Sequence, residues 1–300
     1  MTVREAILEG TAQLRTAGIE TPYLDATVLL AYCMGVTKEH LFAEFLSPVP
    51  ETTLTNFRDC LEKRERGIPV SYIRRQKEFY GRLFYVDERT LVPRPDTETA
   101  VEAALDLIDA MAGSPRANAA PRGAPGAAPD EAPPVPRVLD CCTGSGCIAV
   151  TLKAERPHID VAGSDVSADA REVFLLNSNR ILGEELVFHS SDLLKSISGN
   201  FDIIVSNPPY LRSDEVEKMR SRGWPEPPEA LDGGPDGLDT VRELVEEALY
   251  SLKPYGYLVI EVADDQNDGV RHLMEDAGYR EVTSRSDLAE RRRVVVGRRG

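Results

Sequence analysis

The sequence contains few cysteine and histidine residues, and their spacing matches no common metal site. Its five cysteines include no Cys-x-x-Cys pair, and its four histidines lie far apart in the chain. Structural zinc sites need paired ligands at short spacing, whereas disulfide scaffolds need a dense, even set of cysteines. We therefore expect no metal site and no disulfide framework, and free thiols favour a reducing cytoplasm.

Positive charge and long apolar runs are also scarce. The chain of 300 residues has a formal net charge of −15 at pH 7, which argues against broad attraction to a nucleic-acid backbone. The best apolar stretch, Leu24–Val36, contains Asp25 and is too short to cross a membrane. Met1–Gly10 lacks the apolar core of a signal peptide. The sequence predicts a cytoplasmic protein with no membrane contact and no direct nucleic-acid contact.

The remaining composition is that of an ordinary globular protein, and the length favours two domains. In residues 1–75 apolar side chains recur at helical spacing, which predicts a small helical N-terminal domain. Alternating aromatic and β-branched residues in 76–92 predict a β-hairpin linker. Residues 93–300 form the second predicted domain, which an Ala-, Pro- and Gly-rich insertion at 113–137, expected to be disordered, interrupts.

Short β-branched runs alternate with helical patterns through most of the second domain. This alternation predicts repeated βαβ units and a mainly parallel sheet, an α/β fold. The expected strands are Val138–Cys141, Asp160–Gly163, Leu186–His189, Asp202–Ser206 and Tyr257–Val262. Ligands of such sheets bind at the carboxyl ends of the strands, so these ends are the place to look for chemistry.

A glycine-containing loop follows the first of these strands, in the order Cys142, Thr143, Gly144, Ser145, Gly146. Its two glycines let the backbone approach a ligand closely, and the helix that follows offers free N–H groups. Asp165 ends the second strand, where a carboxylate can accept hydrogen bonds from both hydroxyls of a ribose. The loop matches a dinucleotide fingerprint as well, so these residues suit NAD and S-adenosylmethionine equally.

A third candidate feature follows the next strand. Asp192 can accept a hydrogen bond from the exocyclic amine of an adenine, and Leu193 can pack against the ring. By itself Asp192 is as well explained as a helix cap. Its position in series with Gly144 and Asp165 favours a nucleotide-binding role.

The fourth strand runs directly into Asn207, Pro208, Pro209 and Tyr210. Two prolines end the ladder, and the Asn207 side-chain oxygen together with the Pro208 carbonyl can hold both N–H groups of a planar amide or amine. Tyr210 can stack on, or close over, that flat group. The alternative is a proline-rich turn with a solvent-facing aromatic ring. We interpret these four residues as the catalytic loop of a transferase that methylates a planar nitrogen; no general base is evident.

With these motifs the chain resembles the HemK/PrmC family of protein-glutamine N5-methyltransferases. The resemblance covers nearly the whole chain, and its most specific parts are Val92–Glu98 (Val-Pro-Arg-Pro-Asp-Thr-Glu) and Gly233–Leu238 (Gly-Gly-Pro-Asp-Gly-Leu). It implies a seven-stranded, Rossmann-like class I methyltransferase sheet with a small N-terminal helical domain that contacts the substrate protein. It also implies S-adenosyl-L-methionine as cofactor and, as substrate, the glutamine of the Gly-Gly-Gln motif in class 1 peptide chain release factors.

Carried over by position, the family's sites fall on the residues already singled out. The implied cofactor contacts are Cys142, Thr143, Gly144, Ser145, Gly146, Asp165, Asp192, Leu193 and Asn207, and the implied catalytic residues are Asn207, Pro208, Pro209 and Tyr210. Cys142 departs from the pattern, because the family usually has glycine there. Backbone clearance for the cofactor is therefore expected to be tighter.

Three other functions remain as alternatives. An adenine N6-methyltransferase acting on DNA or RNA would suit the same Asn-Pro-Pro-Tyr loop, since adenine N6 is also a planar nitrogen, but a flipped base needs basic and aromatic surface. A non-catalytic S-adenosylmethionine-binding module would not need Asn207–Tyr210 intact. An NAD-dependent dehydrogenase leaves that loop unexplained.

Overall fold

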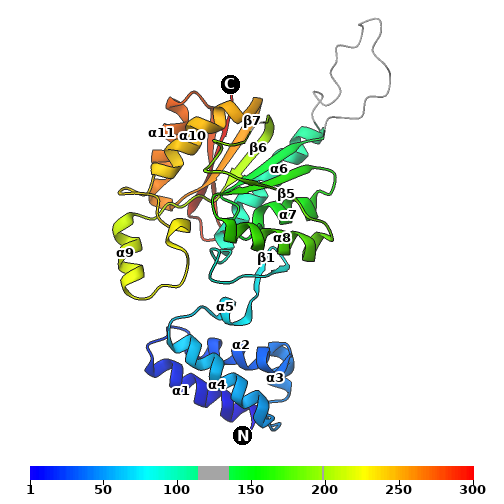
Figure 1. The fold of residues 1–300 in the computed structure, drawn as a ribbon, viewed down its shortest axis with the longest axis vertical. Helices are drawn as coiled ribbons and strands as arrows, with labels where there is room; N and C mark the ends of the chain where they lie inside the picture. Colours follow the sequence, from blue (N-terminus) through cyan, green and yellow to red (C-terminus); the bar gives the residue numbers. More distant parts are fainter. Residues whose placement is uncertain (114–134, 198) are drawn as a thin grey trace, which may run out of the picture. The chain divides into compact units, whose positions relative to one another are not determined.

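The structure is a computed structural model, and it describes residues 1–113, 135–197 and 199–300 (Figure 1). Most of the insertion predicted at 113–137 lies outside these residues. The chain divides into two compact units, which we describe separately. Unit 1 comprises Met1–Gln76, Val86–Glu88 and Met219–Pro225, and unit 2 comprises Lys77–Tyr85, Arg89–Lys218 and Glu226–Gly300.

Unit 1 is built from short amphipathic helices around one apolar core. A capping box, in which Thr2 and Glu5 exchange hydrogen bonds with each other's backbone, begins the first helix. Ile7, Leu29 and Leu61 are fully or almost fully buried where the helices pack together. The helices are α1 (Val3–Thr16), α2 (Pro22–Met34), α3 (Lys38–Ala43), α4 (Glu51–Glu65) and α5 (Val70–Arg74).

Unit 2 begins with an antiparallel hairpin, β1 (Lys77–Phe79) and β2 (Arg82–Phe84). The Val-Pro-Arg-Pro-Asp-Thr-Glu segment then forms a single 3₁₀ turn, η1 (Pro95–Thr97), before helix α6 (Glu98–Gly113). Proline fixes its own φ and is favoured in the first turn of a helix, which explains why the turn starts at Pro95.

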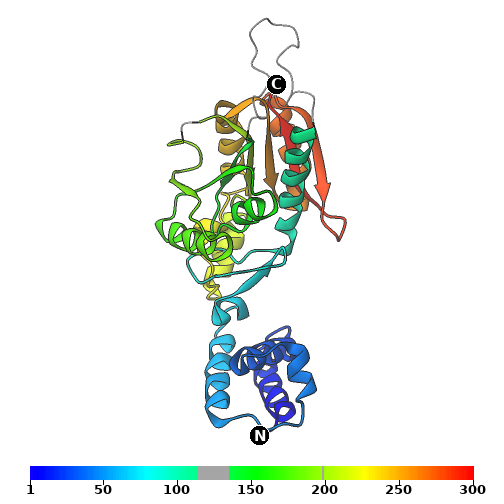
Figure 2. The same cartoon turned by 90° about the vertical axis from the view of Figure 1, so that its right-hand side faces the viewer.

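A seven-stranded sheet forms the centre of unit 2, with the strand order β5-β4-β3-β6-β7-β9-β8. The first five strands in this order are parallel, whereas β9 is antiparallel to both β7 and β8. The β8–β9 hairpin, red in Figure 2, forms one edge. The bounds are β3 (Arg137–Cys141), β4 (Asp160–Asp165), β5 (Val187–Ser190), β6 (Phe201–Ser206), β7 (Leu252–Glu261), β8 (Arg280–Ser286) and β9 (Arg292–Arg298). The predicted seven-stranded Rossmann-like sheet is confirmed.

Helices cover both faces of this sheet, so each face has its own core. Figure 1 shows α6, α7 and α8 on one side and α10 and α11 on the other, in agreement with two separate clusters of buried side chains. The remaining bounds are α7 (Cys147–Glu155), α8 (Ala168–Leu182), α9 (Ser213–Ser221), η3 (Pro228–Ala230), α10 (Asp239–Ser251), η4 (Asp264–Gln266) and α11 (Asn267–Asp276).

The strand order reverses direction at β3, which lies between β4 and β6. The chain runs outward from β3 to β4 and β5, then crosses back to β6, and the loops beyond these strands separate there. This switch point is where open α/β sheets bind ligands. Within the described part of the chain, no helix is long and apolar enough to cross a membrane.

Candidate active site

A cavity of about 330 Å³ opens at the carboxyl ends of β3, β4 and β6, within unit 2. Its size lies at the lower end of the range of about 300–1,000 Å³ that is usual for small-molecule sites. Seven of the predicted site residues line it, and they come from all four predicted motifs: Cys142, Gly144, Asp165, Asp192, Leu193, Asn207 and Pro209. The fold therefore brings segments up to 67 residues apart to one site.

The other five predicted residues lie outside the cavity wall. Thr143, Ser145, Gly146 and Pro208 are buried, and Gly146 is the residue just before helix α7. The Tyr210 hydroxyl faces the carboxyl group of Glu261. They lie in the same two loops as Cys142, Gly144, Asn207 and Pro209, which do line it. In the described residues no group of three or more His, Cys, Asp or Glu side chains is placed to hold a metal ion.

Asp140, inside β3, holds the glycine-containing loop. Its Oδ2 accepts hydrogen bonds from the Thr143 hydroxyl at 2.6 Å and from the Ala149 backbone amide at 3.0 Å. The side chain is completely buried, and this burial raises its pKa to about 7, because the hydrogen bonds only partly offset the loss of water. One buried carboxyl group thus connects the strand, the loop and the first turn of α7.

Asp165 holds the same loop from the neighbouring strand and also faces the cavity. One oxygen accepts the Gly144 amide at 2.9 Å, and the other accepts the Ser167 amide at 3.0 Å. Burial raises the pKa of Asp165. Each carboxylate oxygen has a second lone pair, so Asp165 can still accept hydrogen bonds from two ribose hydroxyls.

The loop backbone fits a ligand that approaches closely. Gly144 has a φ of +52°, and a β-carbon added there would meet no atom within 4 Å, so the space beside the backbone is open. Cys142 takes a similar left-handed conformation, with a φ of +58°, although it has a side chain. A hydrogen bond that the Cys142 thiol donates to Cys141, followed by burial, raises the pKa of Cys142, so the thiol stays protonated.

Asp192 and Leu193 stand at the other wall of the cavity and differ in character. Leu193 is only 7% exposed but lines the cavity, where its side chain offers an apolar surface to a flat ring. The Asp192 side chain is 61% exposed and pairs with Lys195 at 2.6 Å. An exposed ion pair of this kind contributes little stability, so Asp192 can turn to a ligand at small cost.

The Asn-Pro-Pro-Tyr loop leaves β6 and is fastened from behind. Leu211 donates its amide to the Leu231 carbonyl at 2.9 Å, and Gln266 donates its side-chain amide to the Tyr210 carbonyl at 2.9 Å. Gly237, from the Gly-Gly-Pro-Asp-Gly-Leu segment, packs so closely that a β-carbon there would lie 2.4 Å from the Tyr210 carbonyl oxygen. These contacts give that segment a structural role as the support of the loop.

Thr97 and Glu261, which the sequence analysis did not select, contact the Asn-Pro-Pro-Tyr loop. Asn207 donates its side-chain amide to the Thr97 hydroxyl at 3.1 Å, and the Tyr210 hydroxyl lies 3.5 Å from Oε1 of Glu261. Burial raises the pKa of Glu261 to about 7, and burial also raises the pKa of Tyr210. Glu261 is the last residue of β7, so the rule that places sites at strand ends could have identified it.

Two family models match the chain in agreement with this architecture. The model for the PrmC N-terminal domain matches residues 5–74, and the model for the methyltransferase small domain matches residues 131–221. The second match covers β3, the glycine-containing loop and the Asn-Pro-Pro-Tyr loop. The fold, the cavity and these matches define the class of the protein: a Rossmann-like methyltransferase.

Curated relatives are similar over the whole chain. A release factor glutamine methyltransferase of Clostridium acetobutylicum is 31% identical, over 100% of this chain and 99% of its own length. Those of Koribacter versatilis, at 34% over 100% and 99%, and of Xylella fastidiosa, at 35% over 92% and 92%, are similar to the same degree. The chain belongs to the release factor glutamine methyltransferase family.

Solved structures show the same fold at lower sequence identity. A methyltransferase from Pyrococcus furiosus has a TM-score of 0.50 at 18% identity and covers 75% of this chain and 92% of its own. The hMettl16 catalytic domain, solved with the MAT2A 3′UTR hairpin 6, has a TM-score of 0.51 at 13% identity and covers 84% and 83%. At these identities the likeness establishes the fold alone.

Proposed function

We propose that this protein transfers a methyl group from S-adenosyl-L-methionine to the side-chain amide N5 of the Gly-Gly-Gln glutamine of class 1 peptide chain release factors. One observation carries the proposal. Asn207 and Pro209 line the same cavity as Gly144 and Asp165. A loop suited to a planar nitrogen therefore stands beside a loop suited to a nucleoside, in a chain whose family is named for glutamine methylation.

The chain's own residues fit the cofactor in the cavity. The open space beside Gly144 suits a close backbone contact, Asp165 suits the ribose and buried Leu193 suits the adenine ring. Asp192 would accept the adenine amine once it leaves Lys195. When bound, the cofactor supplies a methyl group on a positively charged sulfur, which is a strong electrophile.

The protein's task is then to orient a poor nucleophile. The lone pair of an amide nitrogen is delocalised into its carbonyl, so alignment must provide most of the rate. In this proposal Asn207 Oδ1, at the cavity, and the Pro208 carbonyl, in the same loop but outside the cavity wall, accept the two N–H groups of the glutamine. Positive charge develops on the nitrogen as the carbon–nitrogen bond forms and the bond between the methyl carbon and sulfur breaks. These acceptors stabilise the charge until one proton leaves to solvent.

The helical unit 1 is the proposed recognition surface for the release factor. Its residues 5–74 match the model for the PrmC N-terminal domain, and residues 131–221 of the same chain match the methyltransferase small domain. The proposed division is a recognition domain at 1–75, a hairpin linker at 76–92 and a catalytic domain at 93–300. Because release factors act during translation, the proposed location is the cytoplasm.

The test is the initial rate of methyl transfer from labelled S-adenosylmethionine to a purified class 1 release factor. We expect transfer to the wild-type factor and none to a factor whose Gly-Gly-Gln is changed to Gly-Gly-Asn. Asn207→Ala should abolish most of the rate, whereas Asn179→Ala, an exposed position on α8, should not. Transfer to adenine-containing oligonucleotides with none to the release factor would overturn the proposal in favour of nucleic-acid methylation.

A further inference from the structure

Three polar side chains from three separate elements meet at the cavity wall, which Asn207 lines. Asn207 follows β6, Thr97 ends the 3₁₀ turn η1 and Glu261 ends β7. Thr97 is 1% exposed and Glu261 is 1% exposed, so water does not compete for their hydrogen bonds. Their arrangement decides which atoms of Asn207 face the cavity.

The direction of each hydrogen bond follows from the chemistry of a hydroxyl group. Asn207 donates its amide N–H to Thr97 Oγ1 at 3.1 Å, so Thr97 acts as acceptor there. The single Thr97 proton is left for another acceptor. Glu261 lies on that side, and the Thr97 hydroxyl favours its ionised form as a hydrogen-bond donor.

The carboxyl group of Glu261 has few hydrogen-bond partners. Oε2 of Glu261 is buried and has no partner at normal hydrogen-bond geometry among the residues that the structure describes. Its Oε1 has the Tyr210 hydroxyl at 3.5 Å, which is a weak contact. The Glu261 carboxyl group therefore lacks a strong hydrogen-bond donor. The Thr97 hydroxyl is the group that can rotate its proton toward it.

We propose that Thr97, oriented by Glu261, is a positioning residue that fixes the Asn207 side-chain amide with its NH₂ inward and its Oδ1 toward the acceptor nitrogen. This inference rests on the proposed function and extends it to two residues. If the Asn207 side-chain amide flipped, its Oδ1 would face Thr97 and accept the hydrogen bond from the Thr97 hydroxyl. Glu261 would then lose its donor, so the turned state is disfavoured.

Charged groups from several elements surround Glu261 and set its protonation. Asp96 of η1 raises its pKa, Arg293 of β9 lowers it, and Tyr210 and Thr97 lower it through hydrogen bonds. Cys147 lies at the start of α7. Burial and, to a smaller extent, the charge of Glu261 raise the pKa of its thiol, so the thiol stays neutral. With burial as the largest cause, the pKa of Glu261 stays near 7.

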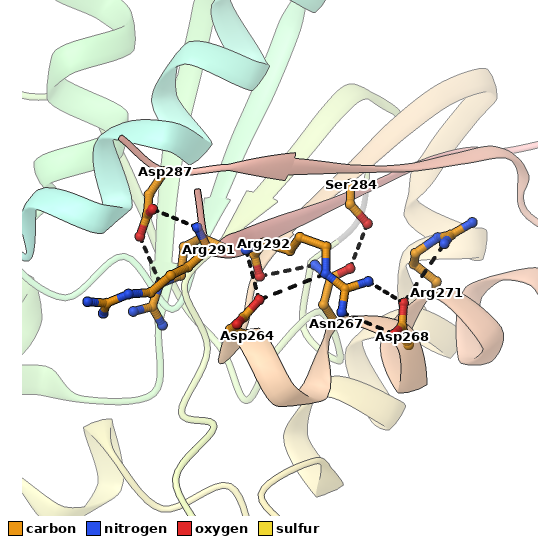
Figure 3. Close-up of polar contacts among 9 residues, drawn as sticks. Asp264, Asn267, Asp268, Arg271, Ser284, Asp287, Arg291 and Arg292 are labelled. Atoms are coloured by element: carbon orange, nitrogen blue, oxygen red, sulfur yellow. Dashed lines mark hydrogen bonds and ion pairs between the residues drawn. The ribbon is translucent and has the colours of Figure 1, made fainter. Parts of the chain in front are cut away.

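Arg293 is held in place by ion pairs at the beginning of β9. Its guanidinium contacts Asp96 at 3.0 Å and Asp287 at 3.3 Å. Figure 3 shows how the same end of β9 is anchored on both sides: Asp287 accepts the Arg291 amide, and Arg292 contacts Asp264. The positive charge of Arg293, which lowers the pKa of Glu261, is thus held by the β8–β9 connection.

The first experiment compares Thr97→Val, which keeps the shape of the side chain but removes the hydroxyl, with Thr97→Ser, which keeps the hydroxyl. Methyl transfer to the release factor and S-adenosylmethionine affinity are measured for each. Thr97→Val should lower kcat about 10- to 100-fold, the range expected for one lost hydrogen bond at a reacting centre. Cofactor Kd should stay within about 3-fold, and Thr97→Ser should restore kcat to within about 3-fold.

Thr99→Val provides the matched control, because Thr99 is a buried threonine two positions further along. It should leave kcat and Kd near the wild-type values. An equal loss of kcat in Thr97→Val and Thr99→Val, or no loss in Thr97→Val, would overturn the positioning role. A loss in cofactor Kd that matches the loss in kcat would overturn it too.

The second experiment uses pH, which a merely structural role would not change in this way. The wild-type kcat should rise as the pH increases through about 7, because only the ionised Glu261 is a pure acceptor for Thr97. Glu261→Gln should have a lower kcat and lose this rise. A Glu261→Gln profile identical in shape to wild type would contradict the inference, even if the variant is less stable.

Failure of this inference is distinguishable from failure of the proposed function. If the wild-type protein does not methylate the release factor, the proposed function fails. If wild type methylates it and the threonine and glutamate variants behave like the Thr99→Val control, only the positioning role of Thr97 fails.

Discussion

Two buried carboxyl groups near the carboxyl ends of two strands in one sheet serve different purposes. Asp140 of β3 accepts a hydroxyl and a backbone amide, so it fixes the path of the cofactor loop. Glu261 of β7 faces side chains, Tyr210 and Thr97, behind the acceptor loop. Burial raises the pKa of both to about 7. The same kind of buried carboxyl group therefore has two uses: Asp140 fixes the backbone on one side of the site, and Glu261 orients side chains on the other.

The sheet register explains how the two groups come to share one site. Cys141 of β3 pairs with Ser206 of β6, which in turn pairs with Ile260 of β7. Asp140 and Glu261 each lie one residue from this row, on either side of the central strand β6. The cofactor loop follows β3 and the Asn-Pro-Pro-Tyr loop follows β6, which is the neighbouring strand. The difference in partners predicts that changes at Asp140 affect stability and changes at Glu261 affect rate.

The largest effect on stability should come from Asp140→Ala. The change leaves the Thr143 hydroxyl and the Ala149 amide unpaired in a buried place, so we expect a loss of about 3 kcal/mol in the free energy of unfolding. Urea denaturation without cofactor measures it. Glu261→Gln should lose less than half as much. If the two variants lost equal stability, the distinction between the carboxyl groups would fail.

Asp165→Ala should weaken cofactor binding more than it weakens the fold. The variant loses the acceptor for the Gly144 amide as well as the proposed ribose contacts. We expect Kd for S-adenosylmethionine, measured by calorimetry, to rise about 100-fold, which corresponds to about 2.7 kcal/mol. An unchanged Kd would remove Asp165 from the cofactor site.

The pH dependence of stability should show both raised pKa values. Asp140 has a reference pKa of 3.8 and Glu261 one of 4.5, and burial raises both to about 7 in the folded chain. Between these limits the folded state binds more protons than the unfolded state, so stability falls as pH rises and levels off above about 7. Denaturation at a series of pH values should show a smaller fall in Asp140→Asn than in wild type. A steeper fall in the variant would contradict the sign.

The smallest effect is expected from Cys142→Gly, which restores the residue usual in the family. Glycine removes the backbone strain of a left-handed residue at φ +58°, which stabilises the folded state. It also raises the conformational entropy of the unfolded chain, which lowers stability by a similar amount. The free energy of unfolding should change by less than about 1 kcal/mol. Improved cofactor affinity at unchanged stability would show that the Cys142 side chain narrows the cavity.

Much of the fold was predictable because buried parallel strands are continuous apolar runs. All five predicted strands are present, with ends shifted by a few residues; β7, for instance, begins at Leu252 rather than Tyr257. Strand β9 was not among these five predicted strands, and neither was β8. Strand β8 is an edge strand of mostly exposed polar residues, paired only with β9, so it carries no apolar pattern that a single sequence would reveal.

The site was predictable where a motif is local and was missed where it is not. Seven predicted residues line the cavity because each lies at the end of a strand. The contact between Thr97 and Glu261 joins residues far apart in the sequence, and nothing in their local patterns indicates that they meet. Their types, a threonine in a turn and a glutamate after an apolar strand, are as common at solvent-exposed positions.

The most direct measurement is tandem mass spectrometry of the release factor after reaction with the protein and isotopically labelled S-adenosylmethionine. We predict one labelled methyl group, on the side-chain nitrogen of the Gly-Gly-Gln glutamine, and its loss when the enzyme carries Asn207→Ala. A label on any other residue, or an equal label with Asn207→Ala, would contradict the assignment of substrate and site.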